Sequence, residues 1–131
     1  MIFVDTSAIY AWADAADPNH RRAVGRLQAI LDRQETLLTH NYVLVESLAL
    51  LQARLGPAAA LKLATDSRAF RIEWIDEATH ASGILELARS KKRHLSFVDH
   101  VSFLVMKKRR ISVAFAFDPD FATAGFELFE D

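Results

Sequence analysis

The chain has no cysteine among its 131 residues, which excludes disulfide bonds and thiolate metal sites. It also lacks any uncharged apolar run near the roughly 20 residues that a membrane-spanning helix needs, so no membrane protein is expected. No basic segment followed by a long apolar one begins the chain, and no signal peptide is expected. Internal repeats, linkers and low-complexity segments are absent as well. These absences favour one soluble cytoplasmic domain over residues 1–131.

Net charge is also small, because 16 basic residues nearly balance 17 acidic ones and leave −1. A chain of this charge has no bulk attraction to nucleic acid. The basic residues are nevertheless clustered, at Lys91–Arg93 and Lys107–Arg110 on either side of Asp99, and at Arg21, Arg22 and Arg26. Such clusters are typical of helix ends, where cations are favoured. They also suit a positive rim around a site that receives a phosphodiester.

Short apolar segments alternate with segments of helical periodicity. The pattern predicts strands at 2–4, 36–39, 71–75, 111–117 and 126–129, and helices at 8–15, 18–33, 42–55, 58–70, 77–93 and 96–106. This alternation predicts a three-layer α/β domain with a mainly parallel central sheet. The helix at 42–55 is apolar on almost all faces and is expected to be buried. Trp12 and Trp74 are expected to pack in the core, and the five histidines to be structural or at the surface.

Four acidic residues lie inside apolar segments or directly after them: Asp5, Glu46, Asp99 and Asp118. An ionised carboxylate among apolar neighbours is costly unless it is paired or bound to a metal. Asp5 and Asp118 each follow an expected strand, and ligands of parallel sheets bind beyond the carboxyl ends of the strands. The four acids therefore indicate one convergent acidic pocket.

Three of these acids also have an ordinary structural interpretation. Asp5 can cap the helix that follows it, and Asp99 stands three residues after Ser96, the spacing of a capping box. Asp118 precedes a proline and can open a turn, and Asp120 can do the same, so the local pattern does not decide which of the two faces a pocket. Glu46 has no such alternative except a helix edge that touches solvent.

Clustered carboxylates repel one another, and a divalent cation relieves this repulsion. Oxygen ligands without cysteine or a histidine pair at ligand spacing indicate a hard ion, Mg²⁺ or Mn²⁺. Such ions activate water and stabilise displacement at phosphorus, so metal-dependent phosphodiester hydrolysis is the chemistry expected of the four acids. Thr6, Ser7, Asn41 and Ser96 are polar neighbours that can orient the acids or act as caps.

Four segments of the chain resemble, in order and spacing, the signature segments of PIN-domain ribonucleases. These are Val4–Ala8, Asn41–Glu46, Leu95–Asp99 and Phe115–Asp118. The resemblance covers essentially the whole chain and is strongest to small single-domain proteins of the VapC type, the toxins of type II toxin–antitoxin pairs. It departs at Asp118-Pro119-Asp120, where Asp120 can share the role of the fourth acid.

The resemblance implies an α/β/α sandwich whose acidic pocket binds one or two Mg²⁺ or Mn²⁺ ions. Asp5 and Asp99 would be the principal metal ligands, Glu46 and Asp118 would complete the site and help position or deprotonate water, and Thr6 and Ser96 would support them. The implied activity is endoribonuclease cleavage of single-stranded or looped RNA. A homodimer and a small antitoxin partner are also implied.

Other interpretations stay open beside this one. The chain resembles haloacid dehalogenase phosphatases in its strand followed by Asp5-Thr6, but Ser7 occupies the place of their second acid. A catalytically inactive binding module of the same fold has no reason to keep four costly carboxylates. A housekeeping RNA-processing nuclease has the same sequence features as a toxin, and an antitoxin gene directly upstream would separate the two.

Overall fold

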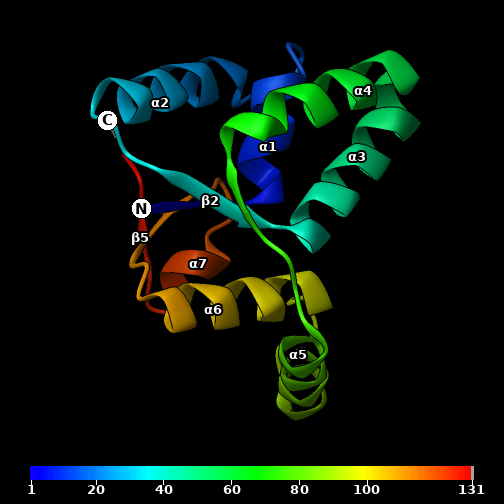
Figure 1. Cartoon of the computed structure of the whole chain (residues 1–131), viewed down its shortest axis with the longest axis vertical. Coiled ribbons are helices and arrows are strands. Elements are labelled where there is room, and N and C mark those ends of the chain that lie inside the picture. The colour runs from blue at the N-terminus through cyan, green and yellow to red at the C-terminus, as the bar shows by residue number, and fades with distance from the viewer. Residues whose placement is uncertain (131) are drawn as a thin grey trace.

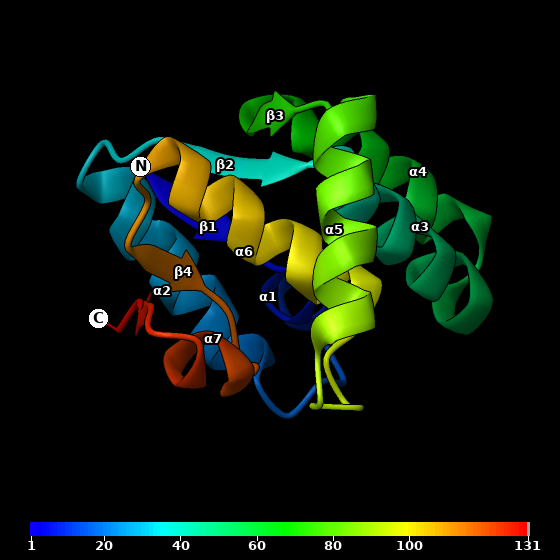
Figure 2. The ribbon, with the colours of Figure 1, turned by 90° about the horizontal axis from the view of Figure 1, so that it is seen from below.

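The computed structural model describes residues 1–130 and is built around a five-stranded sheet in the order β3-β2-β1-β4-β5. Figure 2 labels the first four of these strands, and Figure 1 labels β5. Every neighbouring pair of strands is parallel, including the last pair. The strands are β1 (Ile2–Val4), β2 (Leu37–His40), β3 (Arg71–Glu73), β4 (Val113–Phe115) and β5 (Glu127–Leu128). The chain leaves β1 toward β2 on one side and pairs β1 with β4 on the other. The carboxyl ends of these central strands are thus the expected place for a ligand.

Helices cover both faces of the sheet, which confirms the three-layer α/β/α architecture (Figure 1). One face carries α1 (Thr6–Ala13), α2 (His20–Asp32), α3 (Asn41–Leu55) and α4 (Pro57–Asp66), and the other carries α5 (Glu77–Arg89), α6 (Phe97–Arg109) and α7 (Asp120–Thr123). Helix α6 lies against the sheet, whereas α5 packs mainly on α6 and projects from the body. Within residues 1–130, no helix is long and apolar enough to cross a membrane.

The predicted order of elements is confirmed, and the boundaries differ where local chemistry intervenes. The helix expected to reach residue 70 ends at Asp66 and continues as a short 3₁₀ turn, Ser67–Ala69. This helix begins directly after Gly56, whose φ of +94° is a conformation that glycine adopts without strain. Pro57 then occupies the first helical turn. The segment after Asp118 is not a simple turn, because residues Asp120–Thr123 form the one-turn helix α7.

Helix α3 is not buried on all sides, and that expectation was wrong. Its buried residues, Val43, Ser47 and Leu51, form a single stripe at four-residue spacing. Val45 on another face is 63% exposed. An apolar residue at the surface is no sign of burial by itself, because much of any protein surface is apolar.

The expectation for the two tryptophans was half correct. Trp12 packs against the core, but Trp74, directly after β3, is 73% exposed. Other exposed apolar side chains lie on α4 and α5: Leu61, Ile84, Leu85 and Leu87. Exposed apolar side chains also lie on α2 and α3, so the apolar surface is spread over several helices.

Candidate metal centre

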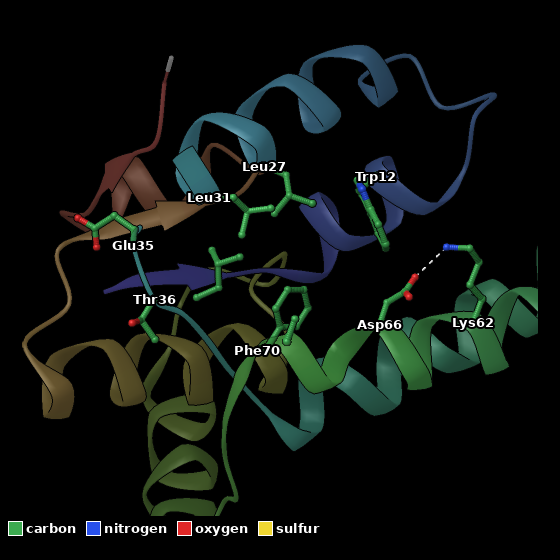
Figure 3. A pocket seen from close by; sticks show the side chains of 10 residues that line it. Trp12, Leu27, Leu31, Glu35, Thr36, Lys62, Asp66 and Phe70 are labelled. Atoms are coloured by element: carbon green, nitrogen blue, oxygen red, sulfur yellow. Dashed lines mark hydrogen bonds and ion pairs between the residues drawn. The ribbon is translucent and has the colours of Figure 1, made fainter. Parts of the chain in front are cut away.

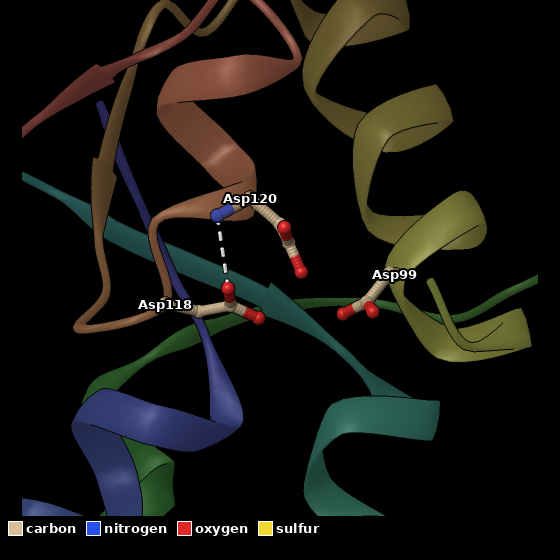
Figure 4. Close-up of side chains that lie close together, drawn as sticks. All are labelled: Asp99, Asp118 and Asp120. Atoms are coloured by element: carbon tan, nitrogen blue, oxygen red, sulfur yellow. Dashed lines mark hydrogen bonds between the residues drawn. The ribbon is translucent and has the colours of Figure 1, made fainter. Parts of the chain in front are cut away.

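Three carboxylates converge beyond the carboxyl ends of β1 and β4. Asp99 comes from the first turn of α6, Asp118 from the segment between β4 and α7, and Asp120 from the first residue of α7 (Figure 4). One oxygen of each lies within 4.8 Å of one oxygen of each of the others. All three side chains are partly buried. Residues about 20 positions apart in sequence are thus brought to a single acidic group.

Asp5 lies behind this group, buried at the end of β1. Its Oδ2 accepts a hydrogen bond of 2.6 Å from the Ser7 hydroxyl and one of 3.2 Å from the Ser7 N–H, which caps α1. The Ser7 hydroxyl in turn accepts from the Phe117 N–H at 3.0 Å. Ser7 therefore connects Asp5 with the segment that carries Asp118. The sequence offered Ser7 among the polar neighbours that can orient the acids or act as caps, and its place two residues after Asp5 is the spacing of an Asx-type contact.

Burial and mutual repulsion act on two of these carboxyl groups. Burial raises the pKa of Asp5 from 3.8 to about 6, against the lowering effect of its bonds to Ser7, and the charge of Asp99 raises it further. The pKa of Asp118 is raised first by burial and then by the charges of Asp120 and Asp99, against the lowering effect of the Asp120 backbone N–H. Ionising the group is therefore costly without a cation.

Asp99 acts as a helix cap and as a member of the acidic group at once. The Ser96 hydroxyl accepts from the Asp99 N–H at 3.1 Å, and Asp99 Oδ2 accepts from the Ser96 N–H at 2.9 Å. This complete capping box fixes the carboxylate at the start of α6. Capping uses one carboxylate oxygen, so the structural interpretation and the pocket interpretation are compatible for this residue.

Asp118 and Asp120 both face the site, which answers the choice that the sequence left open. Asp118 Oδ1 accepts a hydrogen bond of 2.9 Å from the Asp120 N–H. Asp120 Oδ1 lies 3.1 Å from His94 Nε2. His94 was expected to be structural or at the surface, and its contact with Asp120 was not predicted. The only signal in the sequence was its place directly after the basic triplet Lys91–Arg93.

Glu46 does not belong to the group of three carboxylates. It lines a neighbouring hollow on α3 together with Val98, the residue before Asp99. Thr6 is buried beside Asp5, and its hydroxyl has no hydrogen-bond partner within the described part of the chain. A buried hydroxyl of this kind is costly unless a ligand from outside the chain satisfies it.

The donor set fits a divalent cation. All the converging donors are carboxylate oxygens, the ligands that Mg²⁺ and Mn²⁺ prefer. Opposite oxygens around Mg²⁺ are about 4 Å apart, so the spacing of Asp99, Asp118 and Asp120 needs only small side-chain adjustments. The raised pKa values of Asp5 and Asp118 favour the same kind of ligand, because a cation would stabilise their ionised forms.

The two basic clusters on either side of Asp99 lie at different distances from the acids. Lys91–Arg93 is exposed and leads directly into His94, which contacts Asp120. Lys107–Arg110 lies at the other end of α6, about 15 Å along the helix axis from Asp99, and Arg109 pairs with Glu73. The second cluster therefore does not rim the acidic group. Arg26 of α2 stacks over Phe117, next to Asp118, at 5.1 Å.

A separate apolar groove of about 480 Å³ lies between α1, α2 and the end of α4 (Figure 3). Its walls include Trp12, Leu27, Leu31 and Phe70, and an ion pair of 2.8 Å between Lys62 and Asp66 lies at one end. None of its lining residues belongs to the acidic group. It is an apolar surface separate from the acidic group.

Comparisons with known proteins agree with this geometry. The family model described as PIN domain matches residues 2–127. A protein of Mycobacterium tuberculosis described as the 23S rRNA-specific endonuclease VapC20, in strains CDC 1551 / Oshkosh and ATCC 25618 / H37Rv, is 41% identical over 96% of this chain and 95% of its own length. The crystal structure of Mycobacterium tuberculosis VapC20, described as a sarcin–ricin loop cleaving toxin, superposes with a TM-score of 0.85 at 36% identity and 96% coverage of both chains.

Proposed function

This chain belongs to the PIN-domain family, and from that premise we propose that it is a metal-dependent endoribonuclease of the VapC toxin type, formed by one nuclease domain over residues 1–131. The observation that carries the proposal is the convergence of Asp99, Asp118 and Asp120 beyond the central strands, with Asp5 buried behind them. Partly buried carboxylates at the ligand-binding edge of a parallel sheet repel one another, and a bound cation would offset this repulsion.

We assign Asp99, Asp118 and Asp120 to holding Mg²⁺ or Mn²⁺, with Asp5 as a further ligand. When bound, the ion lowers the pKa of water and neutralises charge that develops at the phosphodiester. Glu46, one helix away, positions or deprotonates the attacking water. Ser96 and Ser7 hold Asp99 and Asp5 in place through the hydrogen bonds described above. Thr6 supplies a buried hydroxyl to the same site.

We propose that the substrate is a looped ribosomal RNA, the sarcin–ricin loop of 23S rRNA. The similarity to a protein with that described substrate, at 41% identity over nearly the whole chain, supports this choice. The exposed triplet Lys91–Arg93 beside the acids supplies positive charge for the RNA backbone. Action on ribosomal RNA places the protein in the cytoplasm.

Two partners belong to the proposal. A small antitoxin would need an apolar surface on this protein, and the groove between α1, α2 and α4 is a surface of that kind (Figure 3). A homodimer would cover some of the exposed apolar side chains of α4 and α5, among them Leu61, which is 69% exposed. Light scattering of the purified protein measures the dimer, and co-purification with the product of the gene directly upstream tests the antitoxin.

The test of the nuclease is direct. Purified protein is incubated with a synthetic sarcin–ricin hairpin and with whole ribosomes, in Mg²⁺, in Mn²⁺ and in chelator, beside Asp99→Asn and Asp118→Asn. We expect cleavage only with metal and a fall of about 100-fold or more in each variant, because metal-assisted stabilisation of charge is worth several kcal/mol. Asp66→Asn, which removes a carboxylate of the distant groove, is the matched control. Cleavage that survives chelation or both site variants would contradict the proposal.

A further inference from the structure

A second hollow, of about 450 Å³, adjoins the acidic group and has a different chemical character. Its walls come from α3, α5 and the start of α6: Asn41, Tyr42, Val45, Glu46, His80, Phe97 and Val98. Its volume lies within the range of small-ligand sites. Three of its residues carry rings, and only Glu46 carries a carboxylate. The hollow therefore suits a flat, weakly polar group better than a phosphate.

The hollow is linked to the site of the proposed reaction by two of its lining residues. Val98 lines it and directly precedes Asp99, and Glu46 lines it from the opposite helix. A nucleotide next to the phosphodiester at the acids is consequently within reach of this hollow. Its sugar-phosphate part would follow the acidic group, and its base would be directed to the apolar walls.

The rings of the hollow are held in place before any ligand arrives. The Tyr42 hydroxyl lies 2.6 Å from His80 Nδ1, and the ring centroids of Tyr42 and Phe97 are 5.8 Å apart. His80 meets the Phe97 ring at 5.1 Å in an edge-on arrangement. Phe97 is itself seated against Gly83, where an added Cβ would come within 2.9 Å of the ring. A ring platform fixed in advance loses little entropy on binding.

We propose that this hollow is a subsite for one unstacked nucleobase of the RNA, the base next to the cleaved phosphodiester. The inference rests on the proposed nuclease function and specifies how the substrate is held. Every base has a π-face that stacks on aromatic side chains, and looped RNA presents bases that are free to leave their stack. Asn41 adds a polar contact: its Oδ1 accepts from the Ile75 N–H at 2.7 Å, so the group it offers to a base is its NH₂ donor.

The experiment is a double-mutant cycle, in which an aromatic ring is removed from the protein and a base is removed from the RNA, separately and together. The RNA is a synthetic sarcin–ricin hairpin, intact or with an abasic nucleotide placed in turn on each side of the mapped cleavage position. The protein is the full chain with Tyr42→Leu, which keeps apolar bulk but has no ring face. The matched control is Tyr10→Leu: Tyr10 is also partly buried and bonds Asp14 through its hydroxyl at 2.7 Å, but it does not line the hollow.

We expect the unaltered protein to lose about 5- to 150-fold in kcat/KM on one of the two abasic RNAs, the range that corresponds to stacking of one base. Tyr42→Leu should lose a similar factor on intact RNA and little more on that abasic RNA, whereas Tyr10→Leu should retain the full discrimination. Tyr42→Phe, which keeps the ring, should also retain it. Thermal unfolding of each variant shows whether the fold is preserved.

Equal cleavage of intact and abasic RNA by the unaltered protein would overturn the subsite and leave the nuclease function in place. This comparison uses only the unaltered protein, so it does not depend on whether a variant folds. A change of molar mass in Tyr42→Leu without RNA, with no abasic effect, would assign the hollow to a second copy of the chain and overturn the proposal as well. Absence of all RNA cleavage would overturn both the function and the subsite.

Discussion

At the scale of single residues, the same carboxylates serve as caps and as site residues. Asp5 caps α1 through Ser7, and Asp99 completes a capping box with Ser96. The sequence presented these roles as alternatives, because a spacing shows that a bond can form but not which oxygen remains for another ligand. In the structure, one oxygen of each carboxylate accepts the capping hydrogen bonds, and the other oxygen remains for a ligand at the site.

Asp5 carries a cost in the metal-free protein that can be measured. Its pKa is about 6 in the folded chain and 3.8 in an unfolded one, so the folded state binds more protons between these values. The free energy of unfolding therefore falls as pH rises from about 4 to 6, by roughly 3 kcal/mol from this group alone. Above pH 6 the full cost is present. Asp5→Asn removes the charge and keeps an oxygen that can accept from Ser7.

We expect Asp5→Asn to raise the free energy of unfolding in chelator at pH 7.5 by about 1 to 3 kcal/mol, measured by urea denaturation. Added Mg²⁺ should stabilise the unaltered protein and have much less effect on the variant. Asp14→Asn is the control, because Asp14 is only partly buried and its pKa is lowered by the Tyr10 hydroxyl, so no gain is expected there. A variant less stable than the unaltered protein in chelator would refute the burial argument.

At the scale of elements, a buried histidine joins the two helices that carry Glu46 and Asp99. His40 ends β2 and its Nδ1 accepts from the Tyr42 and Val43 N–H groups, which caps α3. Both partners are donors, so the proton must lie on Nε2, which donates to the Ser102 hydroxyl of α6 at 2.9 Å. Ser102 then donates to the Val98 carbonyl at 2.9 Å, one residue before Asp99.

Protonation of His40 would place a hydrogen against the two N–H groups of the α3 cap. Burial lowers the pKa of His40 from 6.5 to about 4, so between these values the unfolded chain binds more protons than the folded one. The contribution of this group is complete above pH 6.5 and is lost as pH falls toward 4, by roughly 3 kcal/mol. Asp5 changes stability in the opposite direction over almost the same range, so the two effects partly cancel in the unaltered protein.

We expect His40→Asn to be less stable than the unaltered protein by about 1 to 2 kcal/mol at pH 7, because asparagine restores a cap but cannot reach Ser102. The difference should narrow toward pH 4, where the unaltered protein loses the neutral imidazole. Ser102→Ala is the control: it removes the same connection but keeps the titrating ring, so its difference should stay constant with pH. Unfolding curves of His40→Asn and the unaltered protein that remain parallel from pH 7 to 4 would contradict this account.

The elements and their order were predictable because apolar periodicity reports directly on burial in a parallel sheet. The approach of Asp118 to Asp99, with Asp5 behind them, followed from the same topology, whereas Glu46 does not belong to the group. What the sequence could not supply were contacts between distant segments, such as His40 with Ser102 and His94 with Asp120. No local pattern records which side chain lies opposite a helix that begins more than 20 residues later.

At the scale of the whole molecule, charge distribution matters more than net charge. The net charge is only −1, but three acids gather at the proposed metal site, Lys91–Arg93 lies beside them, and Lys107–Arg110 lies at the far end of α6. The sequence placed two basic clusters around Asp99, but the helix between them separates the second from the acids. A helix rises about 1.5 Å for each residue, so residues about ten positions apart lie at opposite ends of α6.

Two lysine pairs allow this difference to be measured with equal changes of charge. Lys91→Gln with Lys92→Gln should weaken binding of the sarcin–ricin hairpin to cleavage-deficient Asp99→Asn protein. It should also reduce the slope of log affinity against log salt by up to about 2, because each phosphate contact contributes slightly less than one unit. Lys107→Gln with Lys108→Gln, at the far end of α6, should change the slope by clearly less. Fluorescence anisotropy between 50 and 300 mM salt measures both, and equal slopes for the two double variants would show that RNA covers the whole length of α6 rather than the end beside the acids.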